Sequence, residues 1–295
     1  LEAARVAAAK ARSRLGAYKG APGLSPFTLT NPGGGAPLLE DATATLVRGH
    51  RYGLIGRNGK GKSTLLRALA ARRVGAIPEQ VTIHYVSQEV TLGADAAAKR
   101  PVEHVVAADV ERRLLLAEAR ELDAAAAEGG ASAAQQKRHA TVLERLEEID
   151  ADSAERRALE LLRALGFTDE LLDRPLSALS GGWRVRTMLA AAIFAKPDLL
   201  LLDEPTNHLS ILAVLWLARE LATNETWAER IVVTVSHDRF FVDEVCTHVL
   251  HISGVARRLT LSKGNYSAWA AQRAETKLTY EREAKQRQEK IDTLD

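Results

Sequence analysis

The sequence has little of three features that would each point to a different class of protein. Cys246 is its single cysteine, so the chain cannot form an internal disulfide, which suits a reducing compartment such as the cytoplasm. Its 40 Lys and Arg residues nearly balance 38 Asp and Glu residues, and the net charge of +2 excludes nucleic-acid binding through a general positive field. Near-apolar runs such as residues 188–195 are far shorter than the roughly 18 residues that span a bilayer, so we expect no membrane insertion.

The sequence does have enough apolar residues for a sizeable core. Of its 295 residues 46% are hydrophobic, which suits one or two domains. Residues 1–20 are rich in alanine and carry Arg and Lys side chains against one acid, Glu2. This composition is typical of a transit peptide, but we favour a solvated helical tail over residues 1–25. Because the chain begins at Leu1 rather than at a methionine, we expect it to be a fragment that starts further upstream in its parent.

The first glycine-rich stretch has the residue types of a phosphate-binding loop. Residues 43–56 predict two short strands around a turn, and the second runs into Gly56-x-x-x-x-Gly61-Lys62-Ser63, after which a helix begins. The loop's backbone N–H groups and the helix N-terminus attract phosphate, Lys62 reaches the β- and γ-phosphates, and the Ser63 hydroxyl suits Mg²⁺. The alternative is a glycine loop that only closes a strand-to-helix turn. The expected ATP-binding residues are Gly56, Arg57, Asn58, Gly59, Lys60, Gly61, Lys62, Ser63 and Thr64.

Two further predicted strands bring acidic and imidazole side chains to the same edge. Residues 199–202 are four leucines, typical of a strand buried on both faces in a parallel sheet, and they are followed by Asp203 and Glu204. Asp203 suits an outer contact to Mg²⁺, and Glu204 suits a general base for water that attacks the γ-phosphate. The alternative is an exposed acidic pair that caps a strand. His237 follows the strand predicted at 231–236, and we interpret it as a γ-phosphate contact rather than a structural histidine.

A second glycine stretch, LSGGW at 179–183, precedes a predicted helix. Ser180 is a plausible N-cap, and the glycines offer a second helix N-terminus to an anion. The alternative is an ordinary helix cap. The apolar positions of the predicted helix recur at helical spacing: Val185, Met188, Leu189, Ala192 and Ile193.

These stretches together resemble the nucleotide-binding domain of ATP-binding cassette (ABC) proteins. The resemblance rests on residues 56–64, Gln88 within YVSQE, LSGGW at 179–183, LLLLDEP at 199–205 and SHDR at 236–239, in that order. It implies an α/β P-loop NTPase fold: a mostly parallel core sheet with an antiparallel β part, an α-helical subdomain and, in this chain, a charged C-terminal helix. It also implies ATPase activity with Mg²⁺ as the cofactor and ATP as the substrate.

The resemblance also assigns roles to individual residues. Gln88 would join Ser63 and Asp203 in holding Mg²⁺, and would act in catalysis with Glu204 and His237. In the family, the signature of one domain closes over the nucleotide that the phosphate loop of another domain holds. A second cassette, in the parent chain or in a homodimer, would therefore be a partner. The signature residues that would contact the partner's ATP are Ser180, Gly181 and Gly182.

Within the family, the chain is similar to the ABC-F group of soluble translation ATPases. The similarity rests on Trp183, on TNHL at 206–209, on SHDRFF at 236–241 and on KGNYSAW at 263–269. Residues 211–222 and HRYGLIG at 50–56 look closest to the eukaryotic subgroup linked to translational control. The similarity implies the ribosome as a partner, and we expect a slow ATPase when one cassette is isolated. Two alternatives stay open: an ATP-gated regulatory binding module with little turnover, and the ATPase subunit of a membrane transporter.

The chain departs from the family's pattern at two places. Ser210 stands where the family usually has Asp, in the loop that couples the two halves of the sandwich, which puts that coupling in doubt. The stretch TNPGGGAP at 30–37 lacks the aromatic residue that stacks on adenine in relatives, and Phe27 is a weak substitute. We therefore expect poor selectivity for the base.

Helical spacing and composition divide the rest of the chain. We expect an ABC domain at 26–270 with a helical subdomain at about 99–187, within which AAAAEGGASAA at 124–134 predicts a flexible connection. Residues 271–295 predict the start of a helical linker between cassettes. A heptad seam with one polar interruption runs through Tyr280, Ala284, Arg287, Ile291 and Leu294.

Overall fold

The core of the protein is a six-stranded sheet. The structure is a computed structural model that describes residues 2–127, 130 and 132–292. The strands lie in the order β4 (Ile83–Val86), β5 (Leu199–Asp203), β6 (Ile231–Val235), β3 (Arg51–Ile55), β7 (His248–Ser253) and β8 (Arg258–Lys263). The first five are parallel, and β8 is antiparallel to β7. Their carboxyl ends therefore meet at one edge, where ligands bind in open α/β folds.

A separate two-stranded antiparallel sheet lies beside this core. It pairs β1 (Gly23–Leu29) with β2 (Leu39–Thr45). The N–H of Glu40 donates to the carbonyl of Arg257 at 2.9 Å, which joins β2 to the turn before β8. The sequence predicted the position of β3 well, but it placed the preceding strand a few residues too late, because the run LEDATAT has little apolar periodicity.

Side chains that alternate along the central strands face two separate apolar layers. Leu200, Leu202 and Val232 face a layer formed by α9 (Gly181–Phe194), α10 (Ile211–Thr223) and α12 (Arg239–Val245). Leu199 and Leu201 face the opposite layer, formed by α2 (Lys62–Ala70) and the β1–β2 sheet. Because side chains alternate across a strand, an all-leucine strand covered on both faces is the expected sequence for this position. The short α11 (Glu225–Ala228) precedes β6 and buries Trp227.

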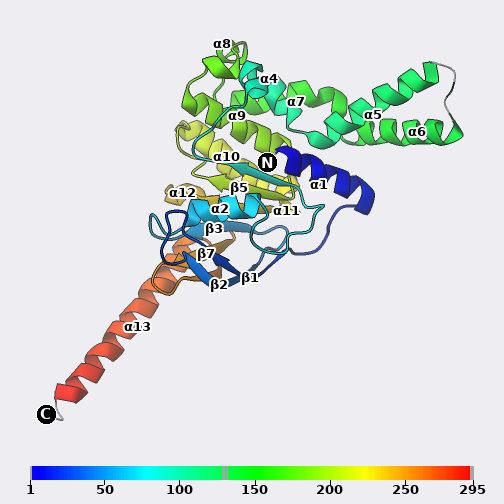
Figure 1. The fold of residues 1–295 in the computed structure, drawn as a ribbon. Coiled ribbons are helices and arrows are strands. Elements are labelled where there is room, and N and C mark those ends of the chain that lie inside the picture. Colours follow the sequence, from blue (N-terminus) through cyan, green and yellow to red (C-terminus); the bar gives the residue numbers. More distant parts are fainter. Residues whose placement is uncertain (1, 128–129, 131, 293–295) are drawn as a thin grey trace.

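The helical subdomain packs at one end of the sheet (Figure 1). It contains α3 (Ala94–Ala98), α4 (Pro101–Ala107), α7 (Ala154–Ala164), α8 (Asp169–Leu172) and α9, with two short 3-10 turns. A hairpin of α5 (Val110–Ala127) and α6 (Ala133–Glu148) extends from it and has a small core of its own, built on Ala119, Val142 and Leu146. The expected flexible connection is shorter than 124–134, because α5 continues to residue 127 and α6 begins at residue 133.

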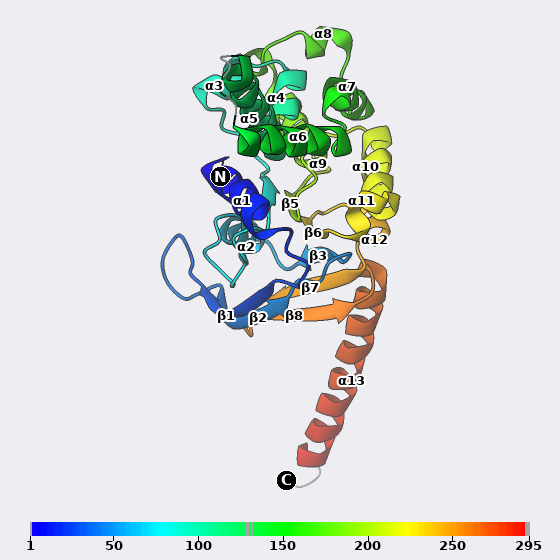
Figure 2. The same ribbon diagram turned by 90° about the vertical axis from the view of Figure 1, so that its right-hand side faces the viewer.

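The two terminal helices differ in how they pack. In α1 (Glu2–Leu15) Ala8 and Ala11 are buried, and Arg12 pairs with Asp198 at 3.1 Å, so the expectation of a solvated helix is wrong. In contrast, α13 (Tyr266–Asp292) points away from the sheet (Figure 2), and its described side chains from residue 271 to 288 are exposed. The expected seam residue Leu294 lies outside the described residues. No helix among the described residues combines the length and the apolar character needed to cross a membrane.

Candidate nucleotide-binding site

The glycine loop connects β3 to α2 and keeps a backbone that only glycine adopts easily. Gly59 and Gly61 have φ of 73° and 96°, in the left-handed region. A Cβ atom at Gly61 would lie 2.9 Å from Cδ1 of Leu38, so a side chain there would also clash. Residues 57–60 are exposed, which leaves their backbone open to a ligand at the N-terminus of α2.

Lys62 begins α2 and folds back over this loop. Its Nζ donates to the carbonyl of Gly56 at 2.9 Å and to Oδ1 of Asn58 at 3.3 Å. Burial lowers the pKa of Lys62, while Glu204 and Asp203 oppose that shift. The ammonium group therefore already lies where it can exchange these neutral acceptors for phosphate oxygens.

Ser63 and Asp203 meet across the gap between α2 and the end of β5. The Ser63 hydroxyl donates to Oδ1 of Asp203 at 3.1 Å. Asp203 is 3% exposed, and its other oxygen, Oδ2, accepts a hydrogen bond from the Tyr85 hydroxyl at 3.1 Å. Burial raises the pKa of Tyr85 to about 12, so this hydroxyl remains a donor at neutral pH. Sequence analysis missed Tyr85; its place on β4, the neighbour of β5, three residues before Gln88, was the available signal.

Glu204 lies one residue beyond β5 and is held in an unusual backbone conformation. Its φ is 54°, and its N–H donates to the carbonyl of Val235 on the neighbouring strand β6 at 2.8 Å. Its Oε2 accepts from the backbone N–H of His237 at 3.1 Å, and Oε1 lies 3.3 Å from Nε2 of the His237 ring. Burial raises the pKa of Glu204, and the hydrogen bond from His237 opposes that shift. The pair therefore forms a buried carboxylate beside an exposed imidazole.

The structure leaves one expected site residue apart from the others. Gln88 lies on a bend just beyond β4, at the same edge of the sheet, and is exposed. It makes no hydrogen bond to any residue that the structure describes, so its part in the site remains a prediction.

The signature stretch begins α9 as expected. Ser180 occupies the N-cap position, as predicted, and its hydroxyl makes no capping hydrogen bond. Ser180 and Gly181 are exposed, which leaves the hydroxyl and the helix N-terminus open to an anion. Within the described part of the chain, no hydrogen bond or ion pair joins residues 180–182 to the glycine loop at 56–64.

The two departures from the family's pattern have clear structural consequences. Phe27 on β1 is 9% exposed and packs in the core layer, so it offers no open face on which adenine could stack. Ser210 is the N-cap of α10, and its Oγ accepts from the N–H of Ala213 at 3.3 Å. The serine therefore keeps the capping role that an aspartate would have, without the charge.

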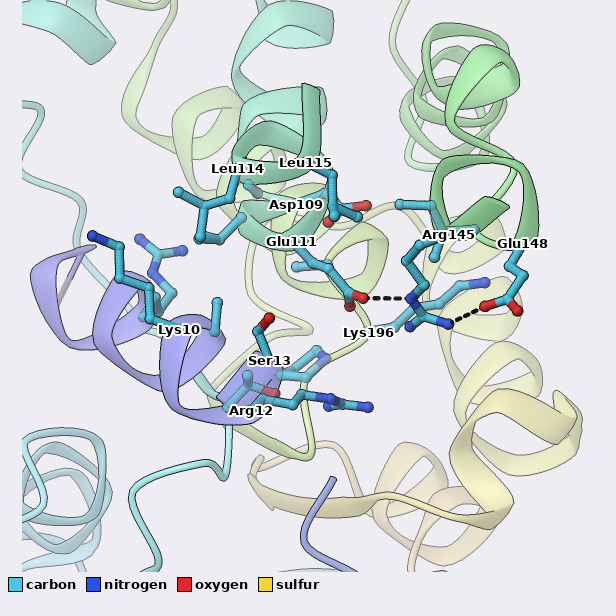
Figure 3. Close-up of a pocket in the computed structure, with 18 of the residues that line it drawn as sticks. Lys10, Arg12, Ser13, Asp109, Glu111, Leu114, Leu115, Arg145, Glu148 and Lys196 are labelled. Carbon is cyan, nitrogen blue, oxygen red and sulfur yellow. Dashed lines mark hydrogen bonds and ion pairs between the residues drawn. The ribbon is translucent and has the colours of Figure 1, made fainter. Parts of the chain in front are cut away.

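One cavity lies away from the glycine loop. It has a volume of about 1260 Å³ and lies between α1 and the α5–α6 hairpin (Figure 3). Arg145 donates to Glu111 and to Glu148, each at 2.7 Å, so these charged lining groups are already paired. The chemistry expected of a nucleotide site lies instead on the open edge of the sheet. That edge and its fold define a P-loop nucleotide-binding domain.

Comparison with known proteins gives the family. A family model described as "ABC transporter" matches residues 39–207. Human "ATP-binding cassette sub-family F member 3" is 42% identical over 252 residues, which are 85% of this chain and 34% of that protein. The chain therefore belongs to the ABC transporter family, as an ATP-binding cassette similar to those of sub-family F. It spans about a third of the length of such relatives.

Solved structures show the same fold. The "ATP binding subunit of ABC transporter" has a TM-score of 0.57 and 22% sequence identity, and covers 86% of this chain and 93% of that one. A dimeric post-hydrolysis ATP-binding cassette bound to ADP and Pi has a TM-score of 0.54 and 18% identity, over 82% of this chain and 97% of that one.

Proposed function

We propose that the chain binds ATP at the glycine loop and that Glu204 activates the water that attacks the γ-phosphate. The observation that carries the proposal is the position of Glu204. Its carboxylate is buried, fixed by the N–H of His237, and adjacent in sequence to Asp203, which contacts Ser63 of the glycine loop. A fixed base whose pKa is raised by burial, beside a phosphate cradle, is an arrangement that suits hydrolysis of an anhydride.

The oxygen atoms of Ser63 and Asp203 suit Mg²⁺. The metal prefers hard oxygen ligands, and a serine hydroxyl with a carboxylate held 3.1 Å away supplies two such atoms. When bound, Mg²⁺ supplies charge neutralisation at the β- and γ-phosphates. Tyr85 would keep the second oxygen of Asp203 oriented through its hydrogen bond. Gln88, exposed at the next strand end, is placed in this group only as a proposal.

The active unit that we propose contains two cassettes. No hydrogen bond or ion pair joins the signature at 180–182 to the glycine loop of its own chain within the described residues, and Ser180 and Gly181 are exposed at the start of α9. A second cassette would place its signature over this nucleotide, and this signature over the other one. The similar cassette bound to ADP and Pi is dimeric, which supports the same arrangement here.

We propose translation on the ribosome as the setting for this ATPase. The support is the similarity of Trp183, residues 206–209 and residues 236–241 to the ABC-F pattern, together with the sub-family F relatives. Ser210 favours a second candidate, an ATP-gated binding module, because the usual aspartate in the coupling loop is absent. The transporter alternative is the least favoured, since the same residues match the soluble group.

The test uses Glu204→Gln, which keeps shape but removes the base. Mixed with ribosomes and Mg-ATP, a longer parent chain that carries this substitution should co-sediment with them, whereas the unsubstituted parent should not accumulate there. The 295-residue chain alone should show ATPase turnover per molecule that rises over about a hundredfold range of protein concentration. Constant turnover would contradict the two-cassette site, and ATP-dependent binding to membrane vesicles instead of ribosomes would favour the transporter alternative.

A further inference from the structure

One arginine on the signature helix joins two parts of the molecule that serve different nucleotides. Arg186 lies one helical turn beyond Gly182 on α9. Its Nη1 donates to the carbonyl of Leu165, at the end of α7 in the helical subdomain, at 3.1 Å. Its Nη2 donates to the carbonyl of His208, in the loop that follows Glu204. A single planar side chain therefore holds α7, α9 and the 204–209 loop together.

The surroundings of Arg186 indicate a geometric role rather than charge pairing. Burial lowers its pKa, and it forms no salt bridge with any residue that the structure describes. Its guanidinium lies 4.1 Å from the centre of the Trp183 ring, and Trp183 in turn meets Phe167 edge-on at 4.8 Å. A partly buried cation without a carboxylate is unfavourable, so its value lies in the rigid fork that can bond two carbonyls at once.

The 204–209 loop is short and is bonded internally. His208 has a φ of 65°, and the N–H of Asn207 donates to the carbonyl of Glu204 at 3.2 Å. The signature also lies close to this loop, because a Cβ atom added at Gly182 would lie 3.3 Å from Cβ of His208. A shift of α9 therefore moves His208 through both Arg186 and Gly182, and His208 is four residues from Glu204.

We propose that Arg186 is a positioning residue that couples the signature to Glu204 within one chain. Contact between the signature and the partner's nucleotide then sets the position of the base that acts on this chain's own nucleotide. The inference rests on the proposed two-cassette site. The proposed coupling makes hydrolysis at one nucleotide site depend on occupancy of the other site, with Arg186 as the physical link.

The experiment compares Arg186→Lys with Arg184→Lys in the 295-residue chain. Arg184 lies on the same helix and also bonds two carbonyls, those of Leu176 at 3.0 Å and Ser177 at 2.8 Å, but both belong to the helical subdomain. For R186K we expect turnover to fall about fivefold or more and the Hill coefficient for ATP to approach one. Affinity of the separated chains for Mg-ATP should stay within about twofold of the original. R184K should keep both turnover and Hill coefficient.

Mixed dimers distinguish coupling from simple damage to the signature helix. An excess of E204Q chains is added to a small amount of active chain, so each working site uses the active chain's Glu204 and the E204Q chain's signature. R186K should lower turnover when it is in the active chain and have little effect when it is in the E204Q chain. The opposite pattern would show that Arg186 only shapes the signature, and it would overturn the proposal.

Two outcomes separate this inference from the proposed function. If the unsubstituted chain shows no concentration dependence and no cooperativity, the two-cassette site is wrong. If it shows both, and R186K keeps its Hill coefficient, only the coupling role of Arg186 is wrong. Should R186K fold poorly by its melting temperature, Arg186→Gln supplies a planar donor that reaches one carbonyl, and the same loss of cooperativity is expected.

Discussion

At the scale of single residues, Glu204 combines a constrained backbone with a buried carboxylate. A non-glycine residue with a φ of 54° is strained unless its surroundings hold it there. Its backbone N–H bonds to Val235 and its side chain to His237, both from the β6 end. The neighbouring strand β6 therefore holds Glu204 in this backbone conformation. The conformation directs the carboxylate along the edge of the sheet where the glycine loop lies.

Titration of Glu204 should be visible in the pH dependence of turnover. Because burial raises the pKa of Glu204 above its ordinary 4.5, the base becomes protonated, and turnover falls, at a pH above 4.5 as the solution is acidified. The backbone N–H of His237 and the charge of its ring both oppose this shift, and His237→Ala removes only the ring, so this variant should move the acid limb to higher pH. At a pH above the acid limb, Glu204→Gln should lower turnover by roughly 10²-fold or more while Mg-ATP still binds. If the acid limb of H237A lies at the same pH as that of the original chain, the pairing of His237 with Glu204 is contradicted.

Ser210 should behave as a helix cap in stability measurements. Ser210→Ala removes the acceptor for the N–H of Ala213, and we expect a loss of about 1 kcal/mol in the free energy of urea unfolding. Ser210→Asp keeps an acceptor and adds a charge that the helix N-terminus favours, so it should be at least as stable as the original. Equal stability of all three would mean that the cap contributes nothing.

Sequence reasoning located the chemistry of the site but not its supports. Lys62, Ser63, Asp203 and Glu204 were found because strand-end and loop patterns are local. Tyr85 and Arg186 were missed because their partners lie over a hundred residues away for Tyr85 and 22 residues away for Arg186. Contacts of this kind depend on packing, and no spacing rule in a single sequence predicts them.

At the scale of elements, α1 shows why composition misled the analysis of the N-terminus. Its basic residues suggested a solvated tail, yet Arg12 and Arg48 of the chain's β2–β3 turn both bond Asp198, which is 2% exposed. The N–H and hydroxyl of Thr82 bond the same carboxylate, each at 2.9 Å. The buried alanines of α1, Ala8 and Ala11, are small residues that let the helix approach closely. The composition of residues 1–20 could not show that Arg12 has a partner in Asp198, a buried acid far along the chain.

Removing the Asp198 carboxylate should destabilise the protein through α1. Burial alone would raise the pKa of Asp198, but the hydrogen bonds from Thr82 and Arg48 and the charge of Arg12 lower it below its ordinary 3.8. A lowered pKa in the folded state means stability that is present above pH 3.8 and is lost as the pH falls through the folded-state pKa.

For Asp198→Asn we therefore expect a loss of about 2 kcal/mol or more in the free energy of urea unfolding at pH 7. The difference from the original chain should shrink below pH 3.8, the ordinary value for the group. Glu79→Gln is the matched control, because its pair with Arg14 on the same helix is 4.0 Å long and exposed. If both variants lose the same stability, Asp198 is not a special anchor for α1.

At the scale of the whole molecule, the parallel sheet presents one set of candidate nucleotide-binding groups at its edge. The helical subdomain presents another set at the start of α9. Four leucines of β5 fix the first set by packing both layers onto one strand. The fold class and this division were predictable, since strands and motifs come in a recognisable order. The extent of the α5–α6 hairpin was not, because alanine-rich helices give a weak apolar period.

The division predicts that two inactive chains should restore each other's activity. Lys62→Ala removes the phosphate contact but leaves the signature intact. Gly181→Asp adds a negative charge at the other anion site, where a Cβ atom meets nothing within 4 Å and where an acid at a helix N-terminus does not disturb folding. Each variant alone should hydrolyse ATP at background rate. In an equal mixture half of the dimers are mixed and each has one of two sites intact, so turnover should reach at most about one quarter of the original, and about fivefold less where the intact site needs the coupling to an occupied partner site. Gly181→Ala, which adds no charge, controls for the added atoms. A mixture as inactive as its parts, with both variants folded and G181D still binding Mg-ATP, would mean that the glycine loop and the signature do not act on the same nucleotide across two chains.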